Sequence, residues 1–79
     1  MMEQAFGNVL RALRKQHKVS QVRLAEYTQL DRTYISLLER GLRQPSLSTV
    51  FKIGTALKIA PSEIVRQVES DVPWNREDC

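Results

Sequence analysis

Apolar residues recur along this chain at intervals of three and four positions rather than two. Such intervals place side chains on one face of an α-helix, whereas a half-buried strand requires alternation by two. The pattern therefore predicts an all-α fold with five helices. Their apolar sides are Phe6, Val9, Leu10, Leu13 and His17 in the first, Leu24, Leu30, Ile35 and Leu38 in the second and third, Leu47, Val50, Phe51, Ile53 and Leu57 in the fourth, and Ile64, Val65 and Val68 in the fifth.

Residues that favour helix ends divide this pattern. The first helix is expected at residues 3–17. Side-chain oxygens accept hydrogen bonds from the free amides of a first turn, glycine tolerates the left-handed conformation that stops a helix, and proline fits a first turn. The predicted boundary residues are Ser20, Asp31 and Ser46 as N-caps, Gly41 as the stop of the third helix, and Pro61 at the start of the fifth.

The length of 79 residues indicates one domain, near the lower limit for folding without disulfides or a metal. The single cysteine, Cys79, has no internal partner, which agrees with a reducing compartment. No apolar run approaches the roughly 18 residues of a membrane span, and the basic N-terminus lacks the cleavage site of a targeting peptide. We expect a cytoplasmic protein with no membrane partner.

Positive charge is concentrated in the middle of the chain. Eight basic residues and three acidic residues lie between Arg11 and Arg43, a local net charge of +5. From Arg66 onward, two basic residues face four acidic ones. A basic body with an acidic end favours a polyanionic partner for one region only. A basic surface that merely faces solvent explains the charge equally well.

Few residues in the sequence are suited to catalysis or to metal binding. The chain has one histidine and one cysteine, no glycine-rich phosphate loop, and no separable pair of carboxylates in a plausible cleft. His17 ends the first helix, where it is better placed to be partly buried or to cap the helix than to act as a base. Together with Cys79 it makes no metal site. We expect no enzyme activity, metal, cofactor or small-molecule ligand.

The two helices predicted at residues 20–40 are too short to persist alone in water, so contacts at their crossing must hold them. Ala25 is small enough for two backbones to meet closely, and the three residues Thr28-Gln29-Leu30 form the connection. This is the helix-turn-helix pattern, whose second helix enters the DNA major groove. We expect a helix-turn-helix DNA-binding domain at 1–69 and a C-terminal tail at 70–79, which contains Trp74.

The run Gln21-x-x-x-Ala25, followed by Leu30 and by Ile35-x-x-x-Glu39-x-Gly41, resembles the phage-repressor (Cro/C1, or XRE) helix-turn-helix family. The resemblance covers residues 6–68. Within that family, LDRTYISLLERG is similar to the recognition helix of restriction-modification controller proteins. The resemblance implies a compact five-helix bundle of the lambda-repressor type. It also implies a sequence-specific transcriptional regulator that occupies promoter DNA.

Two other functions remain open at this stage. A phage or chromosomal repressor of the same family would share the fold and the mode of DNA binding. An antitoxin-like or adaptor module would keep the fold but bind protein, and it would not need Gln21, Arg32 and Arg43 on one side. Whether a regulator of this kind represses, activates or does both depends on the position of its operators, which the chain does not encode.

The resemblance also implies which residues contact double-stranded DNA. Gln21 would bond a phosphate beside the positive end of its helix dipole. Arg32 can bond both acceptors of a guanine, and Thr33 can offer its methyl group to a thymine. Tyr34 either packs at the edge of the helix or bonds a phosphate. The predicted base contacts are Arg32, Thr33, Ser36 and Arg43, and the predicted phosphate contacts are Gln21, Tyr34, Gln44, Ser46 and Thr49.

Two positions bear on the stability of the motif. Arg14 and Glu39 resemble the buried ion pair that links the first helix to the third in this family, although two unrelated surface charges would give the same letters. Gln29 stands where many relatives have glycine. A left-handed conformation there would cost roughly 1–2 kcal/mol, so the turn is expected to differ slightly.

One recognition helix reads only a few base pairs, and discrimination on a genome requires more. Two copies related by a twofold axis would read a pseudo-palindrome with half-site centres ~34 Å apart, or a multiple of that distance. We therefore expect a homodimer that contacts through Ile64, Val65 and Val68 of the last helix. The alternative is that these three residues only close the core of one copy.

Overall fold

The computed structural model describes residues 2–73. It contains five α-helices: α1 (Met2–Gln16), α2 (Gln21–Thr28), α3 (Arg32–Glu39), α4 (Leu47–Leu57) and α5 (Pro61–Asp71). No strand occurs among these residues, so the all-α prediction is confirmed. Because α5 continues to Asp71, the expected tail begins inside this helix. The predictions for Trp74 and Cys79 lie outside the described residues.

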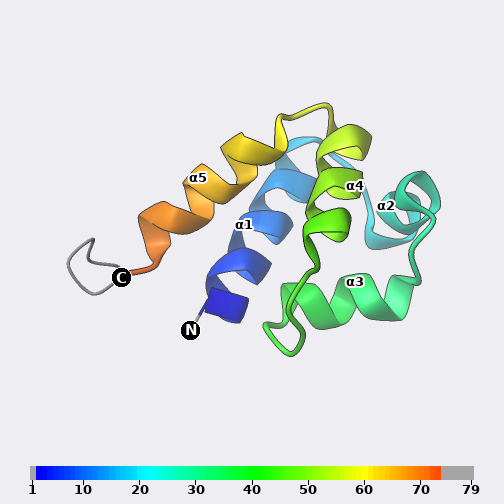
Figure 1. Ribbon diagram of the computed structural model, residues 1–79. Helices are drawn as coiled ribbons and strands as arrows, with labels where there is room; N and C mark the ends of the chain where they lie inside the picture. The colour runs from blue at the N-terminus through cyan, green and yellow to red at the C-terminus, as the bar shows by residue number, and fades with distance from the viewer. Residues whose placement is uncertain (1, 74–79) are drawn as a thin grey trace.

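The helices surround one core (Figure 1). α1 packs against α3 and α5, α2 packs against α3 and α4, and α4 packs against α5. α2 and α3 therefore lie together on one side of the bundle, away from α5. Every helix contributes at least one fully buried side chain, and these are Leu10, Leu24, Ile35, Leu38, Ile53 and Ile64.

The predicted caps set the starts of the helices. Ser20 Oγ accepts from the amide of Arg23 at 3.0 Å, and Asp31 Oδ1 accepts from that of Thr33 at 2.9 Å. Ser46 Oγ accepts from the amide of Thr49 at 3.0 Å, and Pro61 opens α5. Each bond satisfies an amide that has no partner within its own helix. The boundary predictions are confirmed to within a residue of each helix start.

The connection between α2 and α3 has the left-handed residue that the resemblance placed there. Gln29 adopts φ 58°, and the amide of Leu30 bonds the carbonyl of Ala25 at 3.1 Å. Glutamine therefore adopts the left-handed conformation at the position where many relatives have glycine. Gly41 also has positive φ, at 73°, as predicted.

α1 and α3 approach each other closely at Gly7. A Cβ atom at this position would lie 2.5 Å from the carbonyl oxygen of Leu38 and 2.7 Å from that of Glu39. The backbone of α1 thus rests directly on the last turn of α3. Ala25, which was predicted to lie at a close crossing, is buried, whereas the apolar spacing predicted no role for Gly7.

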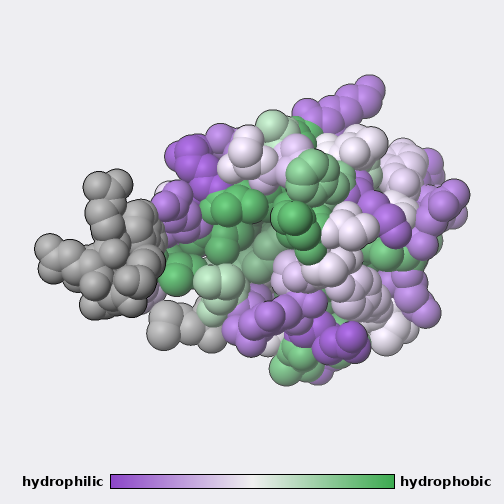
Figure 2. All heavy atoms as spheres, viewed as in Figure 1, coloured by the Kyte–Doolittle hydropathy of each residue, from purple (hydrophilic) through white to green (hydrophobic). Residues whose placement is uncertain are grey.

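Two residues of α4 that were predicted to face inward lie on the surface, and His17, which was assigned to the apolar side of the first helix, is exposed as well. Leu47 is 70% exposed and Phe51 is 55% exposed. The buried apolar residues of α4 are instead Val50, Ile53 and Leu57, and α4 packs against α2 and α5. Leu47 and Phe51 lie four residues apart and form an adjoining stripe. In Figure 2, apolar side chains gather in the middle of the visible face.

Candidate nucleic-acid interface

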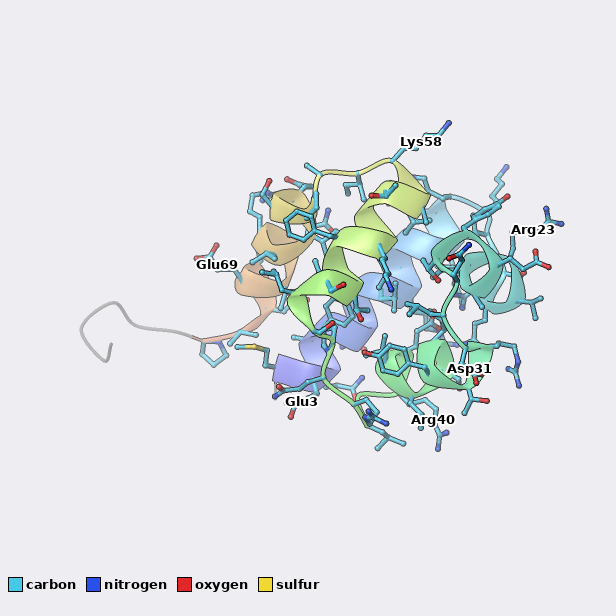
Figure 3. The ribbon with its side chains drawn as sticks, turned by 45° about the vertical axis from the view of Figure 1, so that its right-hand side comes forward. Glu3, Arg23, Asp31, Arg40, Lys58 and Glu69 are labelled. Atoms are coloured by element: carbon cyan, nitrogen blue, oxygen red, sulfur yellow. The ribbon has the colours of Figure 1, made fainter. Side chains whose placement is uncertain are left out.

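α3 turns its apolar side inward and its polar side out of the bundle. Ile35 and Leu38 are fully buried, whereas Arg32 and Thr33 are exposed and Ser36 is half-buried. Arg40 follows the last turn of α3 and points away from the protein (Figure 3). α3, which begins after Asp31, thus presents hydrogen-bonding and cationic groups to solvent along one side.

A polar network with little exposure to solvent holds α3 against α1 and α2. Arg14 Nε donates to Glu39 Oε2 at 2.6 Å, and Arg14 Nη2 donates to Glu39 Oε1 at 3.0 Å. The side chains of Arg14 and Glu39 are only 12% and 4% exposed. Arg14 Nη1 also donates to the carbonyl of Val19 at 3.0 Å, and the bond to Glu39 raises the pKa of the Arg14 guanidinium. The structure therefore contains the ion pair that the resemblance implied.

Gln21, at the start of α2, joins the same network. Its Nε2 atom donates to Glu39 Oε1 at 3.1 Å. A glutamine amide has two N–H groups and one carbonyl oxygen, so this bond uses only part of its capacity. Within residues 2–73, the remaining amide groups of Gln21 have no partner. The side chain is half-buried and held by its bond to Glu39.

Tyr34 packs at the edge of α3, which is one of the two arrangements expected for it. Its ring rests on the core, and its hydroxyl lies 3.4 Å from Thr49 Oγ1. Thr49 is only 5% exposed, and its Oγ1 also accepts from Ser46 Oγ at 3.0 Å. The prediction that Thr49 contacts a phosphate is therefore not supported, because its side chain is enclosed by neighbouring groups.

The loop between α3 and α4 returns to the outer side of α3. The guanidinium carbon of Arg43 lies 5.6 Å from the centroid of the Tyr34 ring, within the range of a cation–π contact. Gln44 Nε2 donates to Glu3 Oε2 at 3.1 Å. This bond lowers the pKa of the Glu3 carboxyl together with a larger contribution from a backbone amide. Arg43, Gln44 and Ser46 are all exposed.

Free positive charge lies around α3. Among the residues that the structure describes, neither Arg32 nor Arg40 forms an ion pair. The exposed pairs Arg23–Glu26 and Arg66–Glu63 lie within α2 and α5. Sequence reasoning missed Arg40 as a candidate contact. Its place directly after Glu39 in LERG, one residue beyond the helix, is the signal that would have identified it.

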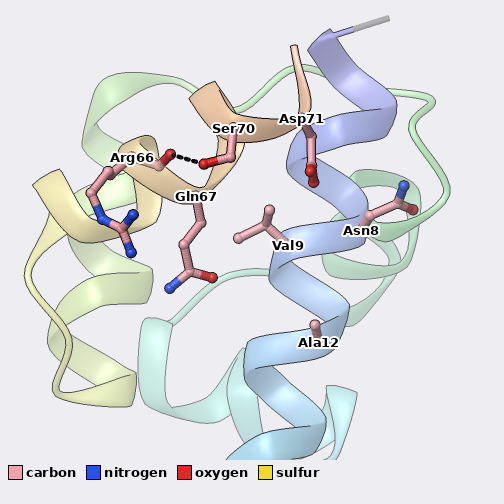
Figure 4. Close-up of a pocket in the computed structure, with 7 residues that line it drawn as sticks. All are labelled: Asn8, Val9, Ala12, Arg66, Gln67, Ser70 and Asp71. Carbon is pink, nitrogen blue, oxygen red and sulfur yellow. Dashed lines mark hydrogen bonds between the residues drawn. The ribbon is translucent and has the colours of Figure 1, made fainter.

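A second surface feature lies away from α2 and α3. A groove of about 450 Å³ between α1 and α5 is lined by Asn8, Val9 and Ala12 and by residues between Arg66 and Asp71 (Figure 4). No residue of α2 or α3 lines it.

His17 Nδ1 lies 2.8 Å from the carbonyl oxygen of Leu13, so the ring caps the end of α1.

The part of the chain between Met2 and Pro73 contains no cluster of three or more potential metal ligands. No helix in that part is long and apolar enough to cross a membrane.

Two short capped helices, the second with a polar outer side and unpaired arginines, define a helix-turn-helix DNA-binding protein. Residues 10–64 match the helix-turn-helix family, and the chain belongs to this family of DNA-binding transcriptional regulators.

The relatives of this chain include a phage repressor and several controller proteins. The chain is 42% identical over 67 residues to the control protein C.MunI of Mycoplasma sp., an alignment that covers 84% of this chain and 90% of the relative. It is 44% identical over 59 residues to the immunity repressor of Bacillus phage phi105, covering 75% of this chain but 41% of that repressor. The crystal structure of the restriction-modification controller protein C.AhdI from Aeromonas hydrophila superposes with a TM-score of 0.76 at 44% identity, covering 78% of this chain and 94% of that one.

Proposed function

We propose that this protein binds a pseudo-palindromic DNA operator as a homodimer and regulates transcription as the autoregulating controller of a restriction-modification system. The outer side of α3 carries the proposal, because Arg32 and Thr33 are exposed there while Ile35 and Leu38 fix the helix to the core. The similarity to C.MunI and C.AhdI over most of their length supports the controller role. The phi105 repressor supports a phage-type repressor as the second candidate.

In this proposal, base edges are read by Arg32, Thr33 and Ser36 from α3 and by Arg43 from the following loop. Arg32 is exposed and has no ion pair within residues 2–73, so it is free to bond both acceptors of a guanine. We add Arg40 to the proposed DNA contacts, as a phosphate contact and not a base contact, since a phosphate needs only a nearby cation.

Phosphates are held at two helix starts. Gln21 uses the amide groups that Glu39 leaves free, beside the N-terminus of α2. Gln44 and Ser46 lie at the start of α4, where the first amides and the helix dipole favour an anion. The DNA-binding unit that we propose comprises all five helices, which moves its C-terminal limit from residue 69 to Asp71. We propose a cytoplasmic, non-catalytic role.

The proposed dimer contact is an apolar surface on α4 and α5, formed by Leu47, Phe51, Val65 and Val68, which we call the α4–α5 surface. Val65 is 50% exposed, and a groove of about 330 Å³ between Leu47, Phe51 and Val65 provides a recess for a partner side chain. Ile64 drops out of the predicted interface because it is 1% exposed in the core of its own chain. The surface contains no residue of α3, so a dimer leaves both recognition helices free.

Selection of bound sequences from a random DNA pool tests the DNA-binding proposal. We expect a pseudo-palindromic motif, and binding that weakens with salt with a log–log slope of about −0.9 per phosphate neutralised. Arg32→Ala should relax the preference at one base pair, whereas Gln21→Ala should weaken all sequences alike. Binding that ignores both salt and DNA sequence would contradict the proposal and favour an adaptor module.

Sedimentation at micromolar concentration tests the dimer. Val65→Glu places a charge in the α4–α5 surface and should give a monomer. Val22→Glu is the matched control, because Val22 is 55% exposed on α2 and lies outside that surface. A dimer that survives Val65→Glu but not Val22→Glu would move the interface to α2.

A further inference from the structure

We propose that Tyr34 is a positioning residue for Arg43: its ring holds the guanidinium of the loop at the edge of α3. The preference at the base pair that Arg43 reads then depends on a side chain that does not contact this base pair. The inference rests on the proposed function, in which Arg43 is a base contact.

Arg43 needs such support because of its place in the chain. It is exposed in the loop between α3 and α4, and within residues 2–73 it has no ion pair to hold it. A free arginine loses much rotamer entropy when it is fixed against a base. In the structure its guanidinium carbon lies 5.6 Å from the centroid of the Tyr34 ring. The negative face of the aromatic ring attracts the cation, so the loop side chain is partly ordered before DNA arrives.

The ring is itself held from the other side. Tyr34 is half-buried and packs against the hydrophobic core. Its hydroxyl lies 3.4 Å from Thr49 Oγ1, and that atom accepts a bond from Ser46 Oγ at 3.0 Å. Since Ser46 caps α4, a continuous series of contacts links the start of α4 to the guanidinium of Arg43. A ring anchored at its hydroxyl and on one face can offer its other face as a rigid support.

The hydroxyl and the ring face of Tyr34 have different roles in this arrangement. The hydroxyl of Tyr34 points toward the first turn of α4, where it lies beside Thr49 Oγ1. The face of the ring is the part that bears on recognition. A leucine at position 34 would still fill the edge of the core, but it has no π-face for the guanidinium. Phenylalanine would keep that face and lose only the contact with Thr49.

The test combines Tyr34→Leu, Tyr34→Phe and Arg43→Ala with the selected operator and with variants of it at each base pair. We expect Tyr34→Leu to reduce the preference at the pair read by Arg43 by about two- to fivefold, the range of an exposed cation–π contact. The preference at the pair read by Arg32 should be unchanged, and Tyr34→Phe should retain both. In the Arg43→Ala background, Tyr34→Leu should change no preference further.

A second measurement needs no variant at Tyr34. In an NMR spectrum of the unbound protein, the side-chain protons nearest the Arg43 guanidinium should be shifted upfield by the ring. Random-coil shifts would overturn the inference. So would a Tyr34→Leu effect that is equal for all sequences or persists in Arg43→Ala, since both describe a purely structural residue. If the unaltered protein selects no motif at all, the proposed function fails as well, which distinguishes the two failures.

Discussion

At the scale of single residues, Gly7 shows how a position without functional groups can set the geometry of the recognition helix. In Gly7→Ala the new methyl group would lie 2.5 Å from the carbonyl oxygen of Leu38, and moving α1 off α3 should cost about 1–3 kcal/mol. The better helix propensity of alanine returns about 1 kcal/mol, so we expect a net loss of stability of up to about 2 kcal/mol. Urea unfolding measures the change, with Asn8→Ala, an exposed neighbour on α1, as the control. Equal stability in both variants would mean that the crossing relaxes freely.

The Arg14–Glu39 pair makes an asymmetric prediction. Arg14→Met leaves a carboxylate that is 4% exposed without its counter-charge and should cost about 3–5 kcal/mol. Glu39→Gln should cost less, because Arg14 keeps its bond to the Val19 carbonyl and retains some access to water. Thermal unfolding of both variants decides the matter. A negligible change in both would show that the pair contributes nothing to stability.

At the scale of elements, the turn between α2 and α3 retains strain that glycine would relieve. Gln29 at φ 58° costs about 1–2 kcal/mol of backbone strain, which a glycine would relieve. About 0.4–1 kcal/mol of this gain in stability would be lost again, because glycine gives the unfolded chain more conformational freedom. Gln29→Gly should therefore raise the free energy of unfolding by up to about 1.6 kcal/mol, measured by chemical denaturation. Gln29→Val, which tolerates positive φ poorly, is the opposite control. A loss of stability in the glycine variant would indicate that the glutamine side chain compensates for its backbone.

The elements were predictable where their signals are local. Ser20, Asp31 and Ser46 act on amides two or three residues away, so a short stretch of sequence contains both partners of each cap. The outward position of Phe51 was not predictable in this way. Its spacing fits the apolar stripe of α4, and the packing of α2 and α5 decides which edges of that stripe are covered.

In the candidate site, too, the positions that depend on local signals were predictable and those that depend on distant contacts were not. Residues on one side of α3, such as Arg32 and Thr33, follow from the helical period and the resemblance. The contact of Arg43 with Tyr34 and the burial of Thr49 depend on the path of the chain after α3, 9 and 15 residues beyond Tyr34. The approach of Gly7 to α3 is likewise a contact between distant segments. Such contacts require the assembled bundle.

At the scale of the whole molecule, dimerisation and recognition should be coupled through the DNA alone, because the α4–α5 surface and the outer side of α3 share no residue. Val65→Glu should therefore leave the affinity for an isolated half-site unchanged. Its affinity for the full pseudo-palindrome should fall toward the half-site value, since two separate molecules must then be ordered instead of one. Gel-shift titrations on both duplexes measure this, with Val22→Glu as the matched control. An equal loss of affinity for the half-site and the full site would show that the substitution disturbs α3 through the fold. Dimerisation through the α4–α5 surface would then not explain a symmetric operator.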